Sequence, residues 1–176
     1  MGSRTGTGDG FEGAAELAGH FLARAICRVQ DGGTVSPLIG HERSVVDGGE
    51  RAVTQLRFEA LDPRDAVRNA EQWLDGNPQG VARAVLVHTG GLLWLGERHE
   101  ALFSRIVDFR RPGRSLEIVI PYRPAAEEEL AVHRPKLFEP RGLPEDLAVI
   151  VKALFRGIDA HAPGGKTLSR DLDETV

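Results

Sequence analysis

The sequence predicts an α+β fold, a mostly antiparallel meander sheet with helices packed on one face, in the order α-β-β-α-β-β-β-β-β-α. Three observations lead to this fold class. Apolar residues recur at helical spacing near both ends of the chain. Residues 53–60 alternate between apolar and polar side chains, which is typical of an antiparallel strand with one wet face. Short apolar runs between glycine and proline turns fill residues 81–138.

The first half of the fold begins with a helix. Residues 11–29 place their apolar side chains on one broad helical face, and Asp31-Gly32-Gly33 then ends the helix. A strand is predicted over 34–42. After a turn at Asp47-Gly48-Gly49, the alternating residues 53–60 form the second strand.

A second helix and a buried strand come next. Asp62-Pro63 supplies an N-cap followed by a proline in the first helical turn, and the helix ends near Gly76-Asn77-Pro78. Residues 81–87 are nearly all apolar, so we expect a central strand that is covered on both faces. Thr89-Gly90-Gly91 is predicted to turn the chain into a short strand at 92–95.

The rest of the sheet is a meander of short strands. A turn at 96–99 leads to a strand at 101–109, and Arg111-Pro112-Gly113-Arg114 makes another reversal into 116–120. Residues 131–138 should be edge-like, because the prolines near them cannot donate hydrogen bonds to a neighbouring strand.

A last helix begins at Pro144-Glu145-Asp146 and carries a strong apolar stripe. The chain of 176 residues fits one domain, which we place at residues 11–161. Residues 1–10 and 162–176 are poor in apolar side chains, and we expect both to be disordered tails.

Composition limits the compartment and the partners. The formal net charge is −4 and no block of basic residues is present, which argues against nucleic acid as a partner. No apolar run approaches the roughly 20 residues that span a bilayer, and no signal peptide is visible, so no membrane association is expected. Cys27 is the single cysteine and cannot form an intrachain disulfide, which favours a reducing, cytoplasmic location. The excess of arginine over lysine is typical of a GC-rich bacterial genome.

One polar cluster lies between two apolar runs. Glu97, His99 and Glu100, with His88 before them, are residue types that bind metals or move protons. If the hairpin closes at 89–91, His88 and His99 lie four residues apart along the strands, or about 13 Å at ~3.3 Å per residue. One ion cannot contact both, so we interpret the cluster as a plain turn and predict no metal site.

A second candidate cluster combines His41 and Glu42, at the end of a predicted strand, with His133. The alternative that we favour is two independent surface histidines, because histidine burial is intermediate.

Arg123 and Arg134 form a third candidate, because arginine binds carboxylate or phosphate through paired hydrogen bonds. The simpler interpretation is a solvated rim, in which they pair with the acidic residues 127–129.

Three stretches, LRFEALDPRDAVRNA, LLWLGERHEALFSRIVDF and VIPYRP, resemble segments of small bacterial proteins of uncharacterised function. In those proteins a strand and a helix precede a glycine-centred hairpin and a strand that ends in a Tyr-Arg-Pro-like motif. The likeness spans about residues 56–124. The order of elements is also similar to that of small acidic secretion-chaperone-like dimers. Neither resemblance implies an activity, a cofactor or a catalytic residue.

The sequence lacks the HExxH, GxSxG, Cys-x-x-Cys and GxxxxGK[ST] motifs, and no cofactor is predicted. We therefore expect a non-catalytic protein-interaction module, an adaptor, assembly component or chaperone-like protein that binds another protein or itself as a homodimer. The alternative is a small-ligand-binding protein or an enzyme with a His/Glu cluster. Its candidate residues are His41, Glu42, His88, Glu97, His99, Arg123, His133 and Arg134.

Overall fold

The structure is a computed structural model that describes residues 10–43, 52–123, 131–143 and 147–161. Within these ranges, three helices and seven strands follow each other in the predicted order. They are α1 (Glu12–Gln30), β1 (Leu38–Glu42), β2 (Val53–Arg57), α2 (Pro63–Gly76), β3 (Arg83–Trp94), β4 (Glu97–Asp108), β5 (Arg114–Arg123), β6 (Ala131–Val132), β7 (Lys136–Arg141) and α3 (Ala148–Asp159). The predicted α+β class is confirmed.

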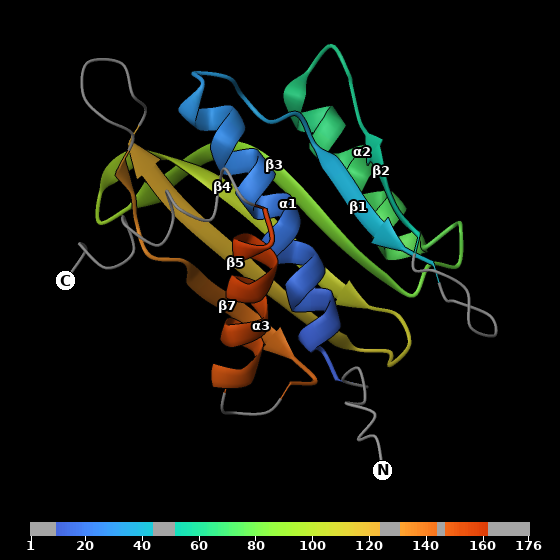
Figure 1. Ribbon diagram of the computed structural model, residues 1–176. Coiled ribbons are helices and arrows are strands. Elements are labelled where there is room, and N and C mark those ends of the chain that lie inside the picture. The colour runs from blue at the N-terminus through green and yellow to red at the C-terminus, as the bar shows by residue number, and fades with distance from the viewer. Residues whose placement is uncertain (1–9, 44–51, 124–130, 144–146, 162–176) are drawn as a thin grey trace.

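All seven strands join one antiparallel sheet (Figure 1). The order is β2-β1-β3-β4-β5-β6, and β7 also pairs with β5. The long strands β3 and β4 form the centre, paired without interruption from Arg83 opposite Asp108 to Trp94 opposite Glu97. The second half of the sheet is thus a meander, as the sequence predicts.

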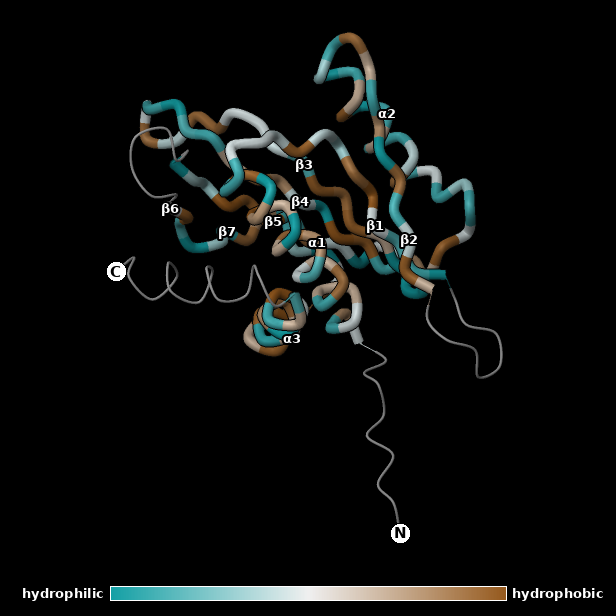
Figure 2. The backbone as a smooth tube through the Cα atoms, turned by 45° about the horizontal axis from the view of Figure 1, so that its top comes forward, coloured by the Kyte–Doolittle hydropathy of each residue, from teal (hydrophilic) through white to brown (hydrophobic). Residues whose placement is uncertain are grey.

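The helices cover both faces of the sheet. Figure 2 shows α1 and α3 on one side and α2 on the other. The alternation of β3 explains this arrangement, since Val85 and Val87 join the core with α1 and α3, while Ala84 and Leu86 join a second core with α2. A strand that is apolar at successive positions needs cover on both faces. The predicted packing on one face therefore holds for α1 and α3 but is wrong for α2.

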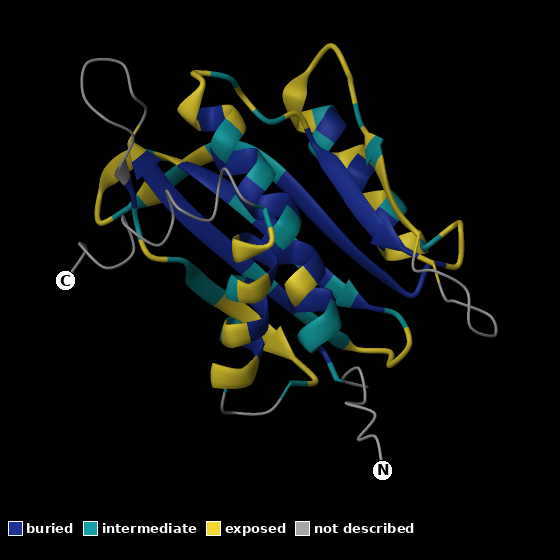
Figure 3. Cartoon of the chain, viewed as in Figure 1, coloured by how far each residue is buried: buried dark blue, intermediate teal, exposed yellow. Residues whose placement is uncertain are grey.

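Two glycines bring α1 and α3 into backbone contact. A Cβ atom on Gly19 would overlap the carbonyl oxygen of Leu154, and one on Gly157 would overlap the carbonyl oxygen of Glu16. Because glycine has no Cβ, the helix axes can approach this closely. The two helices form one layer, and the strands beneath it are buried (Figure 3).

Helix α2 begins and ends as predicted. The carboxylate of Asp62 accepts a hydrogen bond from the backbone N–H of Arg64 at 2.8 Å, and Pro63 lies in the first turn. Asn77 follows the helix with φ 40, and its side chain bonds both the N–H and the C=O of Val81, at 2.8 and 3.1 Å. This paired contact fixes the path from α2 into β3.

The predicted turn at Thr89-Gly90-Gly91 is wrong, because β3 continues through these residues to Trp94. A Cβ atom at Gly90 would lie 3.2 Å from the ring of Phe103, and one at Gly91 would lie 3.2 Å from the side chain of Arg98. Glycine here makes room for large side chains on the neighbouring strand. The chain reverses at Leu95–Gly96 instead.

Some predictions fall outside the described residues: the tail segments 1–9 and 162–176, the turn at 47–49, the acidic residues 127–129 and the helix start at 144–146. In the described part of the chain, none of the helices has the length and apolarity needed to cross a bilayer.

Candidate functional site

The candidate residues His88 and His99 lie on adjacent strands but not together. His88 pairs with Phe103 and His99 with Leu92, so they are four positions apart along the hairpin, or about 13 Å. The His88 ring stacks on the Phe103 ring with centroids 5.3 Å apart. Burial lowers the pKa of His88 below 6.5, against smaller opposing effects of the Thr89 carbonyl and Glu71. Its neutral ring therefore serves as packing.

His41 is a core histidine and not a surface one. It is 2% exposed, because α2 covers this side of β1. Its ring nitrogens lie 3.0 and 3.1 Å from the Thr54 hydroxyl, and its ring lies 5.5 Å from that of Trp73. Three strands of the sheet separate β1 from β6, the strand that immediately precedes His133. His41 and His133 thus do not form one cluster.

Glu97 and His99 form a loose surface pair, with a carboxylate oxygen 3.8 Å from the imidazole Nε2. The Glu97 side chain is 80% exposed, so the pair contributes little free energy. Among the described residues, no three histidine, cysteine, aspartate or glutamate side chains are grouped as metal ligands. Burial raises the pKa of Cys27, the opposite of what a nucleophilic thiol requires.

Glu42, another candidate, belongs to a charged row that runs across the sheet. In register, Glu42 lies opposite Arg83, Arg83 opposite Asp108, and Asp108 opposite Arg114. Glu42, Arg83 and Asp108 are buried beneath the start of α1, where a Cβ atom on Gly13 would overlap the Arg83 guanidinium. The sequence signal for this row was Arg83, a charged residue within the apolar run at 81–87. Its burial gives this row a structural role.

Arg123 and Arg134 are exposed, at the end of β5 and between β6 and β7. Both already interact with other groups of the chain.

The hairpin between β3 and β4 ends in a tight two-residue turn. Leu95 and Gly96 have φ values of 52 and 81, and Trp94 pairs with Glu97, which is the geometry of a type I′ turn. Figure 3 shows this end of the hairpin as exposed. Leu93 is 77% and Leu95 86% exposed. Trp94 instead contacts Lys136, whose ammonium lies 4.0 Å from its ring centroid.

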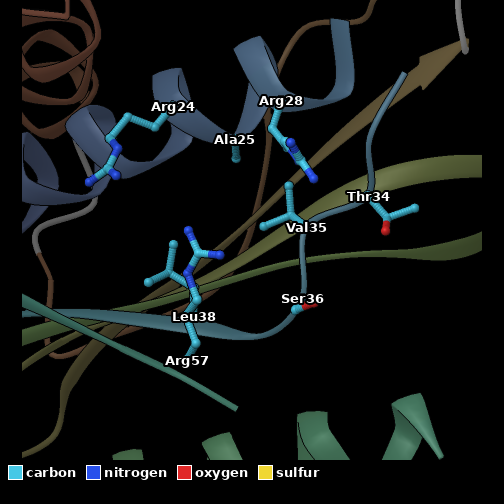
Figure 4. Close-up of a pocket in the computed structure, with 8 residues that line it drawn as sticks. All are labelled: Arg24, Ala25, Arg28, Thr34, Val35, Ser36, Leu38 and Arg57. Atoms are coloured by element: carbon cyan, nitrogen blue, oxygen red, sulfur yellow. The ribbon is translucent and has the colours of Figure 1, made fainter. Parts of the chain in front are cut away.

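A cavity of about 310 Å³ lies between the last turns of α1 and the segment that enters β1 (Figure 4). We call it the arginine cavity. Its lining residues are Arg24, Ala25, Arg28, Thr34, Val35, Ser36, Leu38 and Arg57. Arg28 extends from α1 and Arg57 from β2 into the space between these elements (Figure 4). Sequence reasoning missed this site, although Arg24 and Arg28 stand four residues apart on a helix and Arg57 lies on the wet side of an alternating strand.

These features, the exposed hairpin end and the arginine cavity, are the candidate sites that the geometry offers. Comparisons with protein-family models, with curated proteins and with solved structures give no match to this chain.

Proposed function

We propose that this chain is a non-catalytic protein-interaction module that forms a homodimer through the end of its β3–β4 hairpin. The observation that carries the proposal is the exposure of Leu93 and Leu95 at this end, 77% and 86%. Two neighbouring leucines that stay in water gain nothing for the fold, while a partner that covers them would bury apolar area worth about 25 cal/mol per Å².

The turn itself supports an interaction role. The first residue of a type I′ turn is usually asparagine, aspartate or glycine, because the left-handed conformation costs other L-residues about 1–2 kcal/mol. Leu95 occupies this position with φ 52. Strain at an exposed residue points to function, and Leu95 is 86% exposed, so packing against the described residues does not account for the leucine.

The hairpin presents these leucines on a rigid arm. β3 and β4 each have 12 residues and are paired over their whole length. The Lys136 ammonium over the Trp94 ring adds a cation–π contact from β7. A pre-ordered surface loses little conformational entropy on binding.

A second copy of the chain is the partner that we favour. A twofold axis through two hairpin ends would place leucines against leucines, which is the self-complementary contact of a symmetric dimer. Charge repulsion between the two hairpin ends does not oppose this contact. Glu97 and Arg98, the first residues of β4, carry opposite charges, so the charge of this end is balanced.

The test compares the wild type with the double variant Leu93→Asn/Leu95→Asn by sedimentation velocity over a range of concentrations. We expect a wild-type dimer and a monomeric variant. Leu61→Asn is the matched control, because Leu61 is fully exposed on the loop before α2 and should not affect the dimer.

Three results would contradict the proposal. A monomeric wild type would exclude the homodimer, and a double variant that remains dimeric would exclude the hairpin end as its contact. Turnover of a small molecule by the purified chain would exclude the non-catalytic role. The alternative, a ligand site made by the candidate histidines and glutamates, remains a prediction.

A further inference from the structure

We propose that the arginine cavity binds a small molecule that carries a phosphate group. Arg24 and Arg28 of α1 and Arg57 of β2 line one space of about 310 Å³, with Arg28 and Arg57 exposed to solvent. None of the described residues that line this cavity is acidic. A guanidinium group pairs with phosphate through two parallel hydrogen bonds, and this geometry favours a phosphate that several arginines surround.

Arg24, Arg28 and Arg57 have no counter-ion among the described residues, as is also true of Arg43, Arg64 and Arg98. Several others pair with carboxylates, as Arg68 does with Asp65, Arg105 with Asp75 and Arg156 with Glu16. Within the described residues, the guanidinium groups of Arg24, Arg28 and Arg57 make no ion pair and no hydrogen bond. The Arg24 guanidinium lies 5.7 Å from the centroid of the Phe21 ring.

The three positive charges repel one another, and an anion bound between them would relieve that repulsion. Like charges at positions i and i+4 of a helix repel each other, and Arg24 and Arg28 have this spacing. Arg57 adds a third positive charge from across the cavity (Figure 4). In a chain whose net charge is −4, three arginines around one cavity are a local excess of positive charge.

The floor of the cavity is fixed before any ligand arrives. The backbone N–H of Val35 donates a hydrogen bond to the hydroxyl of Thr89 in β3 at 3.2 Å, and this hydroxyl donates to the Val35 carbonyl at 3.3 Å. The backbone N–H of Thr89 also donates to that carbonyl, at 3.1 Å. Thr34 and Ser36 flank this anchored residue and add hydroxyl groups to the lining. A hydroxyl group can donate a hydrogen bond to a phosphate oxygen without adding charge.

The nearby end of α1 does not repel an anion strongly. Carbonyl groups at a helix C-terminus carry partial negative charge when they lack donors. Here the carbonyls of Cys27, Arg28 and Val29 accept hydrogen bonds from the backbone N–H groups of Asp31, Gly33 and Gly32, at 3.1, 3.0 and 2.9 Å. These carbonyls are therefore already paired with donors of the chain.

The size and charge of the cavity indicate the ligand class. A volume of about 310 Å³ is at the lower end for small-molecule sites. A phosphate monoester carries a charge near −2 at neutral pH, which is opposite in sign to the three arginines of the lining. A dicarboxylate carries similar charge with a flatter arrangement of oxygens, and the experiment separates the two.

The experiment titrates inorganic phosphate, pyrophosphate and succinate into the full chain by isothermal calorimetry at constant ionic strength. We expect saturable one-to-one binding of the two phosphates and much weaker binding of succinate. Arg28→Gln and Arg57→Gln should each weaken phosphate binding about 10-fold or more, because each removes a charge-assisted contact. Arg64→Gln removes one charge from α2 and should leave binding unchanged.

Thermal unfolding gives a second readout that does not depend on heats of binding. Phosphate should raise the unfolding temperature of the wild type and of Arg64→Gln but not of Arg57→Gln, since a ligand stabilises only a fold that binds it. Equal effects of Arg57→Gln and Arg64→Gln, tighter binding of succinate than of phosphate, or the absence of saturable binding would each overturn the proposal. The Leu93→Asn/Leu95→Asn variant should bind phosphate like the wild type, so this test is independent of the hairpin.

Discussion

The Nη1 atom of Arg83 lies 3.3 Å from the Oε2 atom of Glu42, and both side chains are buried beneath α1. They come from adjacent strands and stand opposite each other in register. A buried ion pair adds little net stability compared with apolar residues, but removing one partner leaves an uncompensated charge. Replacing one member alone should therefore cost more than replacing both.

Arg83→Met should lower the free energy of unfolding by about 3–5 kcal/mol, because it leaves the Glu42 carboxylate without its buried partner. Glu42→Leu/Arg83→Met should cost clearly less, since no charge of the pair is left behind. Urea unfolding of both variants measures the difference. Equal losses would show that the side-chain volumes, and not the charges, determine the cost.

Asp108 should make stability fall in acid. Burial alone would raise its pKa, but the hydrogen bonds and charge of Arg110, together with the charge of Arg83, lower it below 3.8. The folded chain therefore binds this proton less readily than the unfolded chain. The stabilisation is fully present above about pH 4 and is lost as the pH falls through the lowered pKa.

The measurement is urea unfolding at a series of pH values between about 6 and 3. Asp108→Asn should be less stable than the wild type at neutral pH and should show a shallower decline in acid. An unchanged acid slope in this variant would assign the decline to other carboxylates.

Gly157→Ala should destabilise the fold, although alanine is the better helix former by about 1 kcal/mol. The new Cβ would overlap the carbonyl oxygen of Glu16, a backbone atom that cannot turn aside, and such overpacking typically costs about 1–3 kcal/mol. Gly76→Ala is the matched control, because a Cβ there meets nothing within 4 Å. Thermal unfolding should show a loss for Gly157→Ala and a small gain for Gly76→Ala. A gain in both would mean that α3 can shift away from α1 without cost.

Leu95→Asn should stabilise the fold by up to about 1 kcal/mol. It creates the Asn-Gly pair that type I′ turns prefer, and it loses almost no burial because Leu95 is 86% exposed. Leu61→Asn, in a fully exposed position with an ordinary backbone, should be neutral. Chemical denaturation at a concentration below that of dimer formation measures both. No gain in Leu95→Asn would mean that the turn tolerates leucine without strain.

Local signals in the sequence determined most of the elements. The N-cap Asp62 and Pro63 predict the start of α2, and the structure has the helix begin at Pro63. The continuous apolar run at 81–87 predicts a strand covered on both faces, which β3 is. These features depend on neighbouring residues, and neighbours in sequence are always neighbours in space.

The candidate sites were less accessible to this reasoning. Gly90 and Gly91 have the composition of a turn, but the long partner strand β4 keeps them extended. The candidate histidines are separate, because strand order placed His41 against α2 and His88 against Phe103. Residue type alone predicted the chemistry of each group and not its surroundings.

The sequence by itself determined the α+β class, the element order, the caps of α2 and the buried central strand. Only the tertiary structure decided that α2 covers the opposite face, that Glu42 meets Arg83, and that Arg57 joins Arg24 and Arg28 around one cavity. The physical reason is the range of the interactions. Hydrogen-bonded turns, caps and periodic apolar faces form within a few residues, whereas pairing across a sheet joins residues far apart in the chain.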